Sequence, residues 1–210
     1  DGRVFVSDSR TGVSYRSGIY DPTNDSWFTT SVQPWQGEEA FNIDNDRLLV
    51  FSPGVSQAMI YTISTDSWTS GTDVGTTILS GTRPIRIGNK IYYHNGSSRI
   101  VEFDLLTLTF ALKTAVSPYS FLNTKPIALG DNYIMYVGLK RSNSSYGSFI
   151  YSILEDAFYG FYDFDYPAGL GEVGATTWTA FLNGLPFFCT TYGSVAPYTK
   201  PQLFNIGSLG

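Results

Sequence analysis

The chain is poor in the residues that build most catalytic and metal sites. Its 210 residues include one cysteine, one histidine and two methionines. The single cysteine, Cys189, excludes an internal disulfide, and its strand-like surroundings indicate a buried thiol that packs as a small hydrophobe. One cysteine and one histidine cannot supply the usual ligands of a zinc site. The composition therefore predicts neither a metal nor a cofactor.

Charge is also scarce, because only 15% of the residues are charged and the net charge is −5. A nucleic-acid groove needs clustered Lys and Arg to displace counterions, so we expect no nucleic-acid partner. No stretch approaches the length of apolar sequence that a membrane-spanning helix requires. The start shows no initiator Met and no signal-peptide pattern, so we expect a processed chain or a piece of a longer protein.

Aromatic residues are abundant, with 15 tyrosines, 15 phenylalanines and four tryptophans. Gly, Ser, Thr and Asn are plentiful as well. This profile is typical of many short strands joined by turns, and it disfavours long helices. At this length the chain can bury a large core as one all-β domain.

A frame of two bulky aromatics seven positions apart occurs four times. The frames are Tyr20–Trp27, Tyr61–Trp68, Phe103–Phe110 and Tyr151–Phe158. Each frame is typical of a strand, a tight polar turn and a second strand, and the starts are about 41, 42 and 48 residues apart. A fifth copy begins at Phe204, and its closing aromatic would fall just past Gly210. Such a period indicates a repeat architecture.

We interpret the repeats as blades of a β-propeller, each made of four antiparallel strands. The repeats span approximately residues 1–35, 36–78, 79–118, 119–168 and 169–210, and they form one propeller domain or a fragment of one. The ends are incomplete, because the first repeat starts at a second strand and the fifth stops before its last strand. Blades outside this chain, or a connecting chain that completes the ring, would each account for these ends.

The third repeat shows the predicted strands most clearly, at residues 83–87, 90–93, 99–103 and 108–112. An Asn-Gly pair separates the second from the third strand, and this pair favours a hairpin because both turn residues must tolerate positive φ. We expect the closing aromatics of the frames to occupy equivalent and largely buried positions. These residues are Trp27, Trp68, Phe110 and Phe158.

Residues 158–166 hold an unusual run of aromatics, Phe-Tyr-Gly-Phe-Tyr-Asp-Phe-Asp-Tyr. Alternation along a strand predicts that the even-numbered Phe158 and Tyr162 share one face, while the odd-numbered Tyr159 and Phe161 share the other. We expect this strand to pack between neighbouring sheets. An aromatic platform for sugars or a protein partner is the alternative.

Patterns that suggest catalysis or ligand binding are few. His94 could anchor a Ser-His-Asp triad in principle, but it lies beside an Asn-Gly turn, where an exposed polar residue is ordinary. Residues 169–174 match the dinucleotide-binding glycine pattern, yet a β-rich segment follows instead of the required helix. Residues 42–46 alternate oxygen ligands, but Arg47 and Pro53 stand where a calcium loop needs Gly and Glu. We therefore expect no catalytic residue, and a loop and a turn at the other two places.

The frames at Tyr20–Trp27 (Tyr-Asp-Pro-Thr-Asn-Asp-Ser-Trp) and Tyr61–Trp68 (Tyr-Thr-Ile-Ser-Thr-Asp-Ser-Trp) resemble the end of a kelch repeat. Kelch repeats close in a Tyr-Asp-Pro-x-Thr-Asn-x-Trp-like segment. They also carry a Gly-Gly pair after the second strand, where this chain has Ser-Asp-Ser, Ser-Pro-Gly, His-Asn-Gly and Val-Gly-Leu. The resemblance implies a propeller fold.

Residues 83–93 and Ile100–Phe103 are similar to the propeller domain of tail nozzle proteins in short-tailed phages. Residues 149–158 fit the strand, turn and aromatic end of such blades. The composition agrees, because few charges and much Thr, Ser, Asn, Gly and Tyr are common in virion proteins. The resemblance implies a structural or docking part and not an active site, placed in a virion or outside the cell.

We therefore expect a non-enzymatic scaffold and docking module of a virion tail or appendage, bound to other structural proteins. Two alternatives stay open: a secreted or cell-surface propeller that recognises glycans or proteins, and a propeller enzyme whose site lies partly outside this chain. Loops carry binding in such folds, and the longest irregular loops fall near residues 34–36, 142–147 and 192–201. The candidate partner-binding residues are Trp35, Tyr146, Tyr192 and Tyr198.

Overall fold

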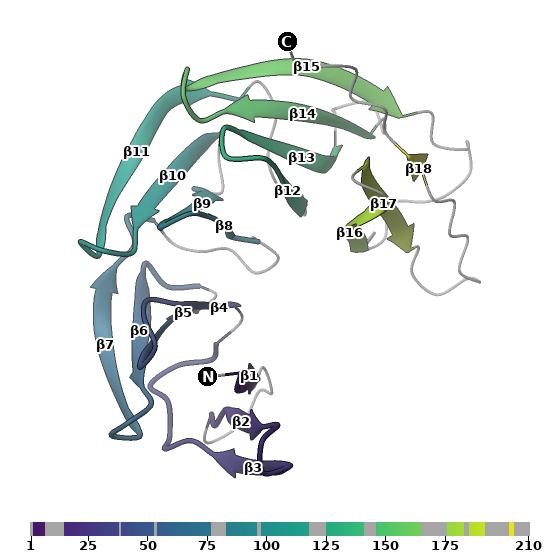
Figure 1. Cartoon of the computed structure of the whole chain (residues 1–210). Helices are drawn as coiled ribbons and strands as arrows, with labels where there is room; N and C mark the ends of the chain where they lie inside the picture. Colours follow the sequence, from purple (N-terminus) through teal and green to yellow (C-terminus); the bar gives the residue numbers. More distant parts are fainter. Residues whose placement is uncertain are drawn as a thin grey trace. The chain divides into compact units, whose positions relative to one another are not determined.

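Short strands make up the secondary structure. The computed structural model describes residues 2–6, 15–37, 39–52, 54–76, 83–95, 98–117, 125–140, 146–164, 176–182, 185–191 and 202–203. Within these ranges the chain forms 18 strands and no helix (Figure 1). The all-β class that the composition predicts is therefore confirmed.

The strands form five sheets, and strands that neighbour each other in the chain also neighbour each other in the sheet. The first sheet contains β1 (Val4–Val6), β2 (Gly18–Asp21) and β3 (Ser26–Thr29). The second contains β4 (Glu39–Asn42), β5 (Arg47–Phe51), β6 (Gln57–Thr62) and β7 (Ser67–Asp73). The third contains β8 (Ile85–Ile87), β9 (Lys90–His94), β10 (Arg99–Asp104) and β11 (Thr109–Val116).

The fourth sheet contains β12 (Lys125–Leu129), β13 (Tyr133–Lys140), β14 (Tyr146–Ser152) and β15 (Ala157–Phe164). The fifth contains β16 (Thr176–Leu182), β17 (Leu185–Thr191) and β18 (Gln202–Leu203). Strand pairing is antiparallel in the first, second, fourth and fifth sheets. Each sheet falls within the residue range of one of the five predicted repeats.

The first sheet corresponds to the last three strands of a complete sheet. Val4 of β1 lies opposite Tyr20, as Leu48 of β5 lies opposite Tyr61. Strand β1 is therefore the counterpart of β5, which is the second strand of its sheet. Among the described residues the first sheet has no counterpart of β4, as the sequence predicts.

The turn inside each frame has the same backbone conformation. The residue five positions after the first aromatic adopts a positive φ of 44–55° in all four frames. These residues are Asp25, Asp66, Leu108 and Asp156. Aspartate tolerates this left-handed region because its short polar side chain bonds locally, whereas a leucine there is strained. The fixed place of this residue explains why the frame keeps a constant length.

A β-bulge recurs in the hairpins that close the second and fourth sheets. In β6–β7 the register shifts between Ala58 and Met59, and in β14–β15 it shifts between Ser148 and Ile150. Phe158 pairs with Tyr151, but beyond the bulge Tyr162 pairs with Ser148. Strand β15 therefore has one extra residue between Phe158 and Tyr162 relative to β14. The side chain of Tyr162 lies outside the described residues, so the predicted sharing of a face with Phe158 stays a prediction.

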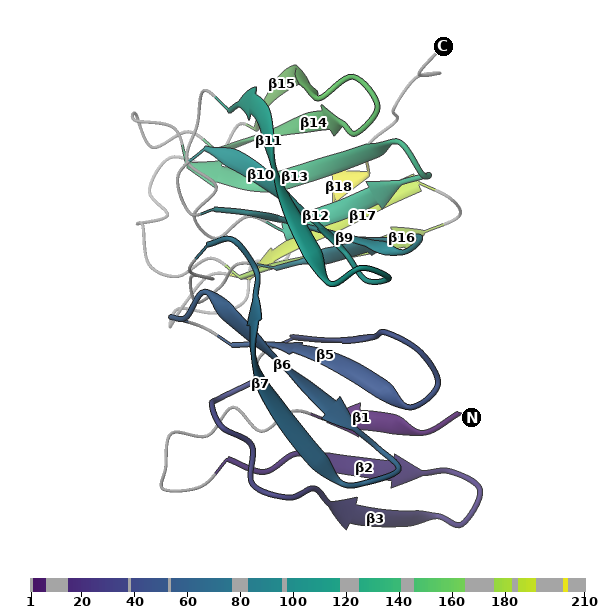
Figure 2. The same ribbon diagram turned by 90° about the vertical axis from the view of Figure 1, so that its left-hand side faces the viewer.

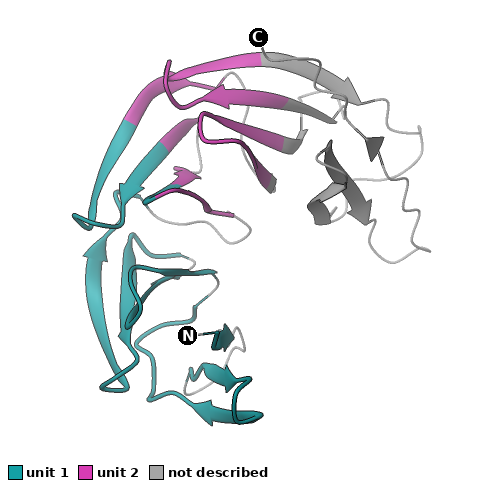
Figure 3. Cartoon of the chain, in the orientation of Figure 1, with its two compact units in different colours: residues 1–80, 89–91, 101–112 teal, residues 81–88, 92–100, 113–210 magenta. Residues whose placement is uncertain are grey.

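The chain divides into two compact units (Figure 3). Unit 1 comprises Asp1–Ser80, Asn89–Ile91 and Val101–Leu112, and unit 2 comprises Gly81–Gly88, Tyr92–Ile100 and Lys113–Gly210. A core cluster of unit 1 contains Ile19, Leu48, Val50, Met59 and Tyr61. A core cluster of unit 2 contains Tyr92, Ile100, Ile134, Tyr136, Phe149 and Tyr151. Each cluster joins the facing surfaces of two successive sheets.

Gly75 provides a test of sheet contact in unit 1. Its φ is +77°, and a Cβ placed on it would lie 2.3 Å from Cδ2 of Phe110. We predict that Gly75→Ala lowers the free energy of unfolding by about 2–4 kcal/mol, through left-handed strain and overpacking together. Gly54→Ala is the matched control, because φ is +80° with no atom within 4 Å and only the strain applies. Equal losses in urea unfolding would contradict the contact with Phe110.

Candidate docking surface

The two aromatics of a frame lie opposite each other on paired strands. Tyr20 pairs with Trp27, Tyr61 with Trp68, and Tyr151 with Phe158. Their ring centroids are 5.1, 4.7 and 5.1 Å apart. This distance is in the range of favourable aromatic pairs. The frame seen in the sequence is thus a cross-strand aromatic pair closed by a turn.

The tyrosine of each pair donates a hydrogen bond to the aspartate of its own turn. The Oη–Oδ1 distance is 2.8 Å for Tyr20 and Asp25, for Tyr61 and Asp66, and for Tyr151 and Asp156. Burial, and then the aspartate, raise the pKa of the Tyr61 and Tyr151 hydroxyls, so both stay protonated as donors. The third frame lacks both the donor and the acceptor of this hydrogen bond, because Phe103 has no hydroxyl and Leu108 has no carboxylate.

Two of these aspartates, Asp66 and Asp156, also bind the preceding repeat. In unit 1, Asp66 Oδ1 accepts from the backbone N–H of Ser31 at 2.8 Å, and the hydroxyl of Ser31 donates to the Asp66 carbonyl at 2.7 Å. The indole Nε1 of Trp68 donates to the Ser31 carbonyl at 3.0 Å. The hydrogen bond from the Ser31 backbone is the main reason that the pKa of Asp66 lies below its usual value. We call this set of contacts the aspartate clasp.

Unit 2 repeats the clasp with different residues. Asp156 Oδ2 accepts from the backbone N–H of Thr114 at 2.8 Å and from its hydroxyl at 2.6 Å. The N–H of Ala115 adds a longer bond of 3.3 Å to Oδ1. Burial raises the pKa of Asp156, but the hydrogen bonds from Thr114 outweigh it and the net shift is downward. Ser31 and Thr114 each lie four residues after the closing aromatic of the preceding frame.

One face of the second sheet and one face of the fourth are each buried against the sheet before it. In unit 1 the buried face of the second sheet contains Leu48, Val50, Met59 and Tyr61, and Phe5 and Ile19 of the first sheet cover it. Figures 1 and 2 show these two sheets side by side. In unit 2 the corresponding face of the fourth sheet is buried by residues of the third. The covering residues are Ile85, Ile87, Tyr92, Ile100 and Ala115.

The corresponding face of the first sheet is exposed. Val4 and Val6 are 50% and 47% exposed, and Trp27 is 62% exposed. The Trp27 ring lies over Gly18, where a Cβ would be 3.2 Å from the ring. We call the surface made by Val4, Val6, Tyr20 and Trp27 the Trp27 face. Exposed apolar surface of this kind marks an interaction site, so it is the candidate docking surface.

The exposure of the closing aromatics differs from the prediction. Trp68 and Phe158 are half-buried, but Trp27 is exposed, and Phe110 is 41% exposed, so the prediction of burial is wrong for these two. Repetition in the sequence indicates equivalent positions but not whether a neighbouring sheet covers them.

The turn of the first frame also lacks the contact to a preceding repeat. Within the part of the chain that the structure describes, Tyr20 is the one hydrogen-bond partner of the Asp25 side chain.

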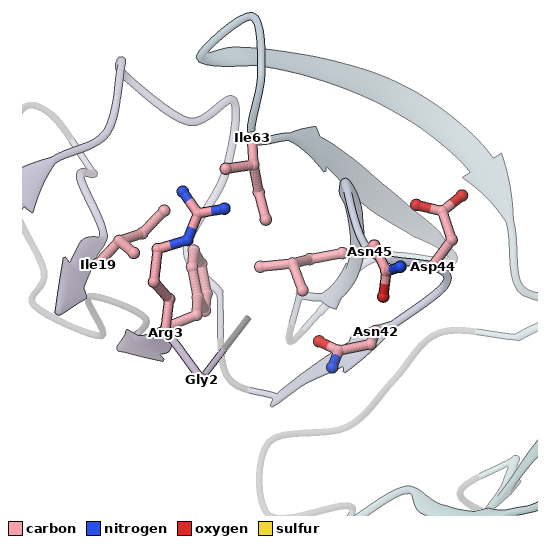
Figure 4. Close-up of a pocket in the computed structure, with 9 residues that line it drawn as sticks. Gly2, Arg3, Ile19, Asn42, Asp44, Asn45 and Ile63 are labelled. Atoms are coloured by element: carbon pink, nitrogen blue, oxygen red, sulfur yellow. The ribbon is translucent and has the colours of Figure 1, made fainter. Parts of the chain in front are cut away.

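A small cavity opens in unit 1 beside the start of β1. Its volume is about 130 Å³, and Figure 4 shows Arg3 and Asp44 on opposite sides of it. The Asp44 carboxylate accepts from the backbone N–H groups of Asp46 and Arg47 at 2.9 and 2.8 Å, and it pairs with the Arg47 guanidinium. The bond from Arg47 is the main cause of the lowered pKa of Asp44. Residues 42–46 form the predicted turn, and their carboxylate is engaged within it.

His94 is buried, not exposed as its place beside a turn predicts. His94 is the last residue of β9, and it is 2% exposed. Burial lowers the pKa of the imidazole to about 4. A triad carboxylate would act in the opposite direction by stabilising the imidazolium. The histidine is therefore a neutral core residue above about pH 5.

The other residues that the sequence suggests as binding sites are not brought together among the described residues. Trp35 is half-buried and packs against the core cluster of unit 1. Tyr146 begins β14, where the backbone alone is described. Tyr192, Tyr198 and the glycines of residues 169–174 lie outside the described residues. The sequence reasoning missed the Trp27 face and the clasp, although the recurring aspartate of the frames was a visible signal.

No three His, Cys, Asp or Glu side chains in the described ranges gather closely enough to hold a metal ion. Over the same residues, no helix has the length and apolar character needed to cross a membrane.

Comparison with known proteins adds no relative. No protein-family model matches the chain, and no curated protein is significantly similar to it. Function is therefore inferred from the residues and their geometry.

The clasp predicts a graded response to the same substitution in three turns. Asparagine tolerates the left-handed backbone, so an Asp→Asn substitution removes the charge and keeps the conformation of the turn. We predict that Asp66→Asn and Asp156→Asn each lower the free energy of unfolding by about 1–2 kcal/mol, because charge-assisted bonds to the preceding sheet weaken at partly exposed sites. Asp25→Asn is the control and loses less. Chemical denaturation measures the three variants, and an Asp25 effect as large as the others would refute the clasp.

The buried histidine predicts a pH effect with a defined sign. A folded pKa of about 4 lies below the ordinary 6.5, so the contribution to stability is complete above pH 6.5 and is lost as pH falls toward 4. Between these limits we predict a loss of about 3 kcal/mol that His94→Asn does not show. Since His94 is the sole histidine, its NMR ring signals are unambiguous. They should not titrate between pH 8 and 5, and a midpoint near 6.5 would contradict the burial.

Proposed function

We propose that this protein is a non-enzymatic β-propeller scaffold and docking module, and that it serves as a structural component of a virion tail or appendage. One observation carries the proposal. The Trp27 face is an exposed apolar sheet surface, while the matching faces of the second and fourth sheets are buried. Such a surface favours a protein partner over solvent.

The repeat structure supports the propeller part of the proposal. Sheets whose strands follow each other in chain order recur with the period of the frames, and within each unit one sheet covers the next. This arrangement is the one expected of neighbouring propeller blades and supports that fold, and both the propeller and the closure of its ring belong to the proposal. The kelch-like frames point to the same fold.

Several features support a structural role over catalysis. The single histidine is buried and neutral, so it offers no accessible base near neutral pH. Asp44, the carboxylate at the small cavity of unit 1, is already bound by Arg47. Low charge and the resemblance to tail nozzle propellers favour a virion setting, in which partners are other structural proteins.

The proposal predicts that the chain is a fixed component of particles. In purified particles from the source, immunogold electron microscopy with an antibody against residues 1–210 should label a tail or appendage. Quantitative mass spectrometry should give a constant copy number per particle. Absence of the chain from purified particles would contradict the virion setting, and specific binding on a glycan array would favour the recognition alternative.

A further inference from the structure

We infer that the Trp27 face binds one further β-sheet of the same repeat kind, through the contacts that hold sheet to sheet within each unit. This inference rests on the proposed docking function and names its partner. The partner would present an apolar sheet face, an outer strand that carries Ser or Thr, and a strand that pairs with β1. Three independent features of the first sheet lead to this description.

The first feature is the apolar surface. Pairing registers make Val4 equivalent to Leu48 and Ile134, because each lies opposite the frame tyrosine. Leu48 is 6% exposed and Ile134 is fully buried, while Val4 is half exposed. Trp27 is likewise equivalent to Trp68 and differs from it in being uncovered. In both covered sheets, apolar side chains of the preceding sheet cover the face.

The second feature is the polar edge of the same surface. Asp25 holds Tyr20 as Asp66 holds Tyr61, and with the same left-handed backbone. Asp66 also binds Ser31, which lies two residues after the preceding outer strand: its carboxylate accepts from the backbone N–H and its backbone carbonyl accepts from the hydroxyl. The Asp156 carboxylate accepts from the backbone N–H and the hydroxyl of Thr114 on the preceding outer strand. The Asp25 carboxylate is placed to accept hydrogen bonds from the same kinds of donor. A Ser or Thr on the partner's outer strand would supply them, and its carbonyl would accept the Trp27 indole N–H as Ser31 accepts that of Trp68.

The third feature is the free edge of β1. Its counterparts β5 and β13 each pair on both sides, β5 with β4 and β6, and β13 with β12 and β14. Strand β1 pairs with β2 alone among the described strands. An unpaired strand edge accepts another strand through its backbone N–H and C=O groups. Apolar face, clasp and strand edge occur together in a repeat sheet, and this combination favours a repeat over an isolated peptide or a sugar.

The chain itself supplies the probe. Residues 83–130 contain the third sheet, with Thr114 on its outer strand, followed by β12. Because Val4 is equivalent to Ile134, fusing residues 83–130 directly before Asp1 gives the junction Gly130-Asp1-Gly2-Arg3. This junction reproduces the spacing of the natural turn from Gly130 to Tyr133. The added β12 would then stand where the first sheet lacks its opening strand.

Oxidative footprinting with mass spectrometry should report the docking at Trp27. We expect the fused copy to slow Trp27 oxidation at least fivefold relative to the unmodified chain, to the rate of Trp68. Leu154, which is 81% exposed, is the internal control and should not change. Thr114→Val in the added copy, or Asp25→Asn in the first sheet, should restore part of the oxidation.

Three results would overturn the inference. One is unchanged Trp27 oxidation with a folded added copy, and another is an added copy that stays unfolded on the chain. The third is concentration-dependent self-association of the unmodified chain that buries Trp27 of one copy against Trp27 of another, since a like face, and not a covering sheet with a Ser or Thr on its outer strand, would then be the occupant. Particle labelling is independent of these results. A failed fusion with labelled particles leaves the proposed function standing, and the reverse outcome leaves the docking geometry standing.

Discussion

The aspartate clasp is the interaction on which the repeat structure depends. An aspartate in a left-handed turn accepts the hydroxyl of its own tyrosine and the backbone N–H of the preceding sheet. The tyrosine bond fixes the carboxylate, so forming the bond to the preceding repeat costs little further conformational entropy. The polar contacts of the clasp at the edge of the sheet and the apolar burial on its face then both hold the sheet against the one before it. In the second and fourth sheets the clasp thereby fixes the position of the sheet on the one before it.

The third sheet shows what replaces the clasp when its groups are absent. Phe103 and Leu108 stand where the other frames have Tyr and Asp, and Leu108 keeps a φ of 55° despite its branched side chain. The contact with the preceding strand is then made by the Phe110 ring against the backbone of Gly75. A glycine provides the close approach that the ring requires. Packing has taken over a role that hydrogen bonds perform elsewhere.

Much of the fold could be predicted from the sequence, because the frames and Asn-Gly pairs act locally. The strands, the class and the missing first strand follow from the spacing of Tyr61 and Trp68 and from the polar turns. Burial could not be read this way, since it depends on whether another sheet covers a residue, as Trp27 shows. His94 was misjudged because a position beside a turn says little about the face of the strand. Simple alternation also does not predict the β-bulges, which add one residue to β7 and one to β15.

A double-mutant cycle on Thr114 and Asp156 tests most directly whether the clasp holds one sheet on the next. Thr114→Val removes the hydroxyl donor with little change in shape, and Asp156→Asn removes the charge of the acceptor. The account predicts a coupling energy of about 1 kcal/mol between the two changes in the free energy of unfolding. Strict additivity, with a coupling below about 0.3 kcal/mol, would contradict it.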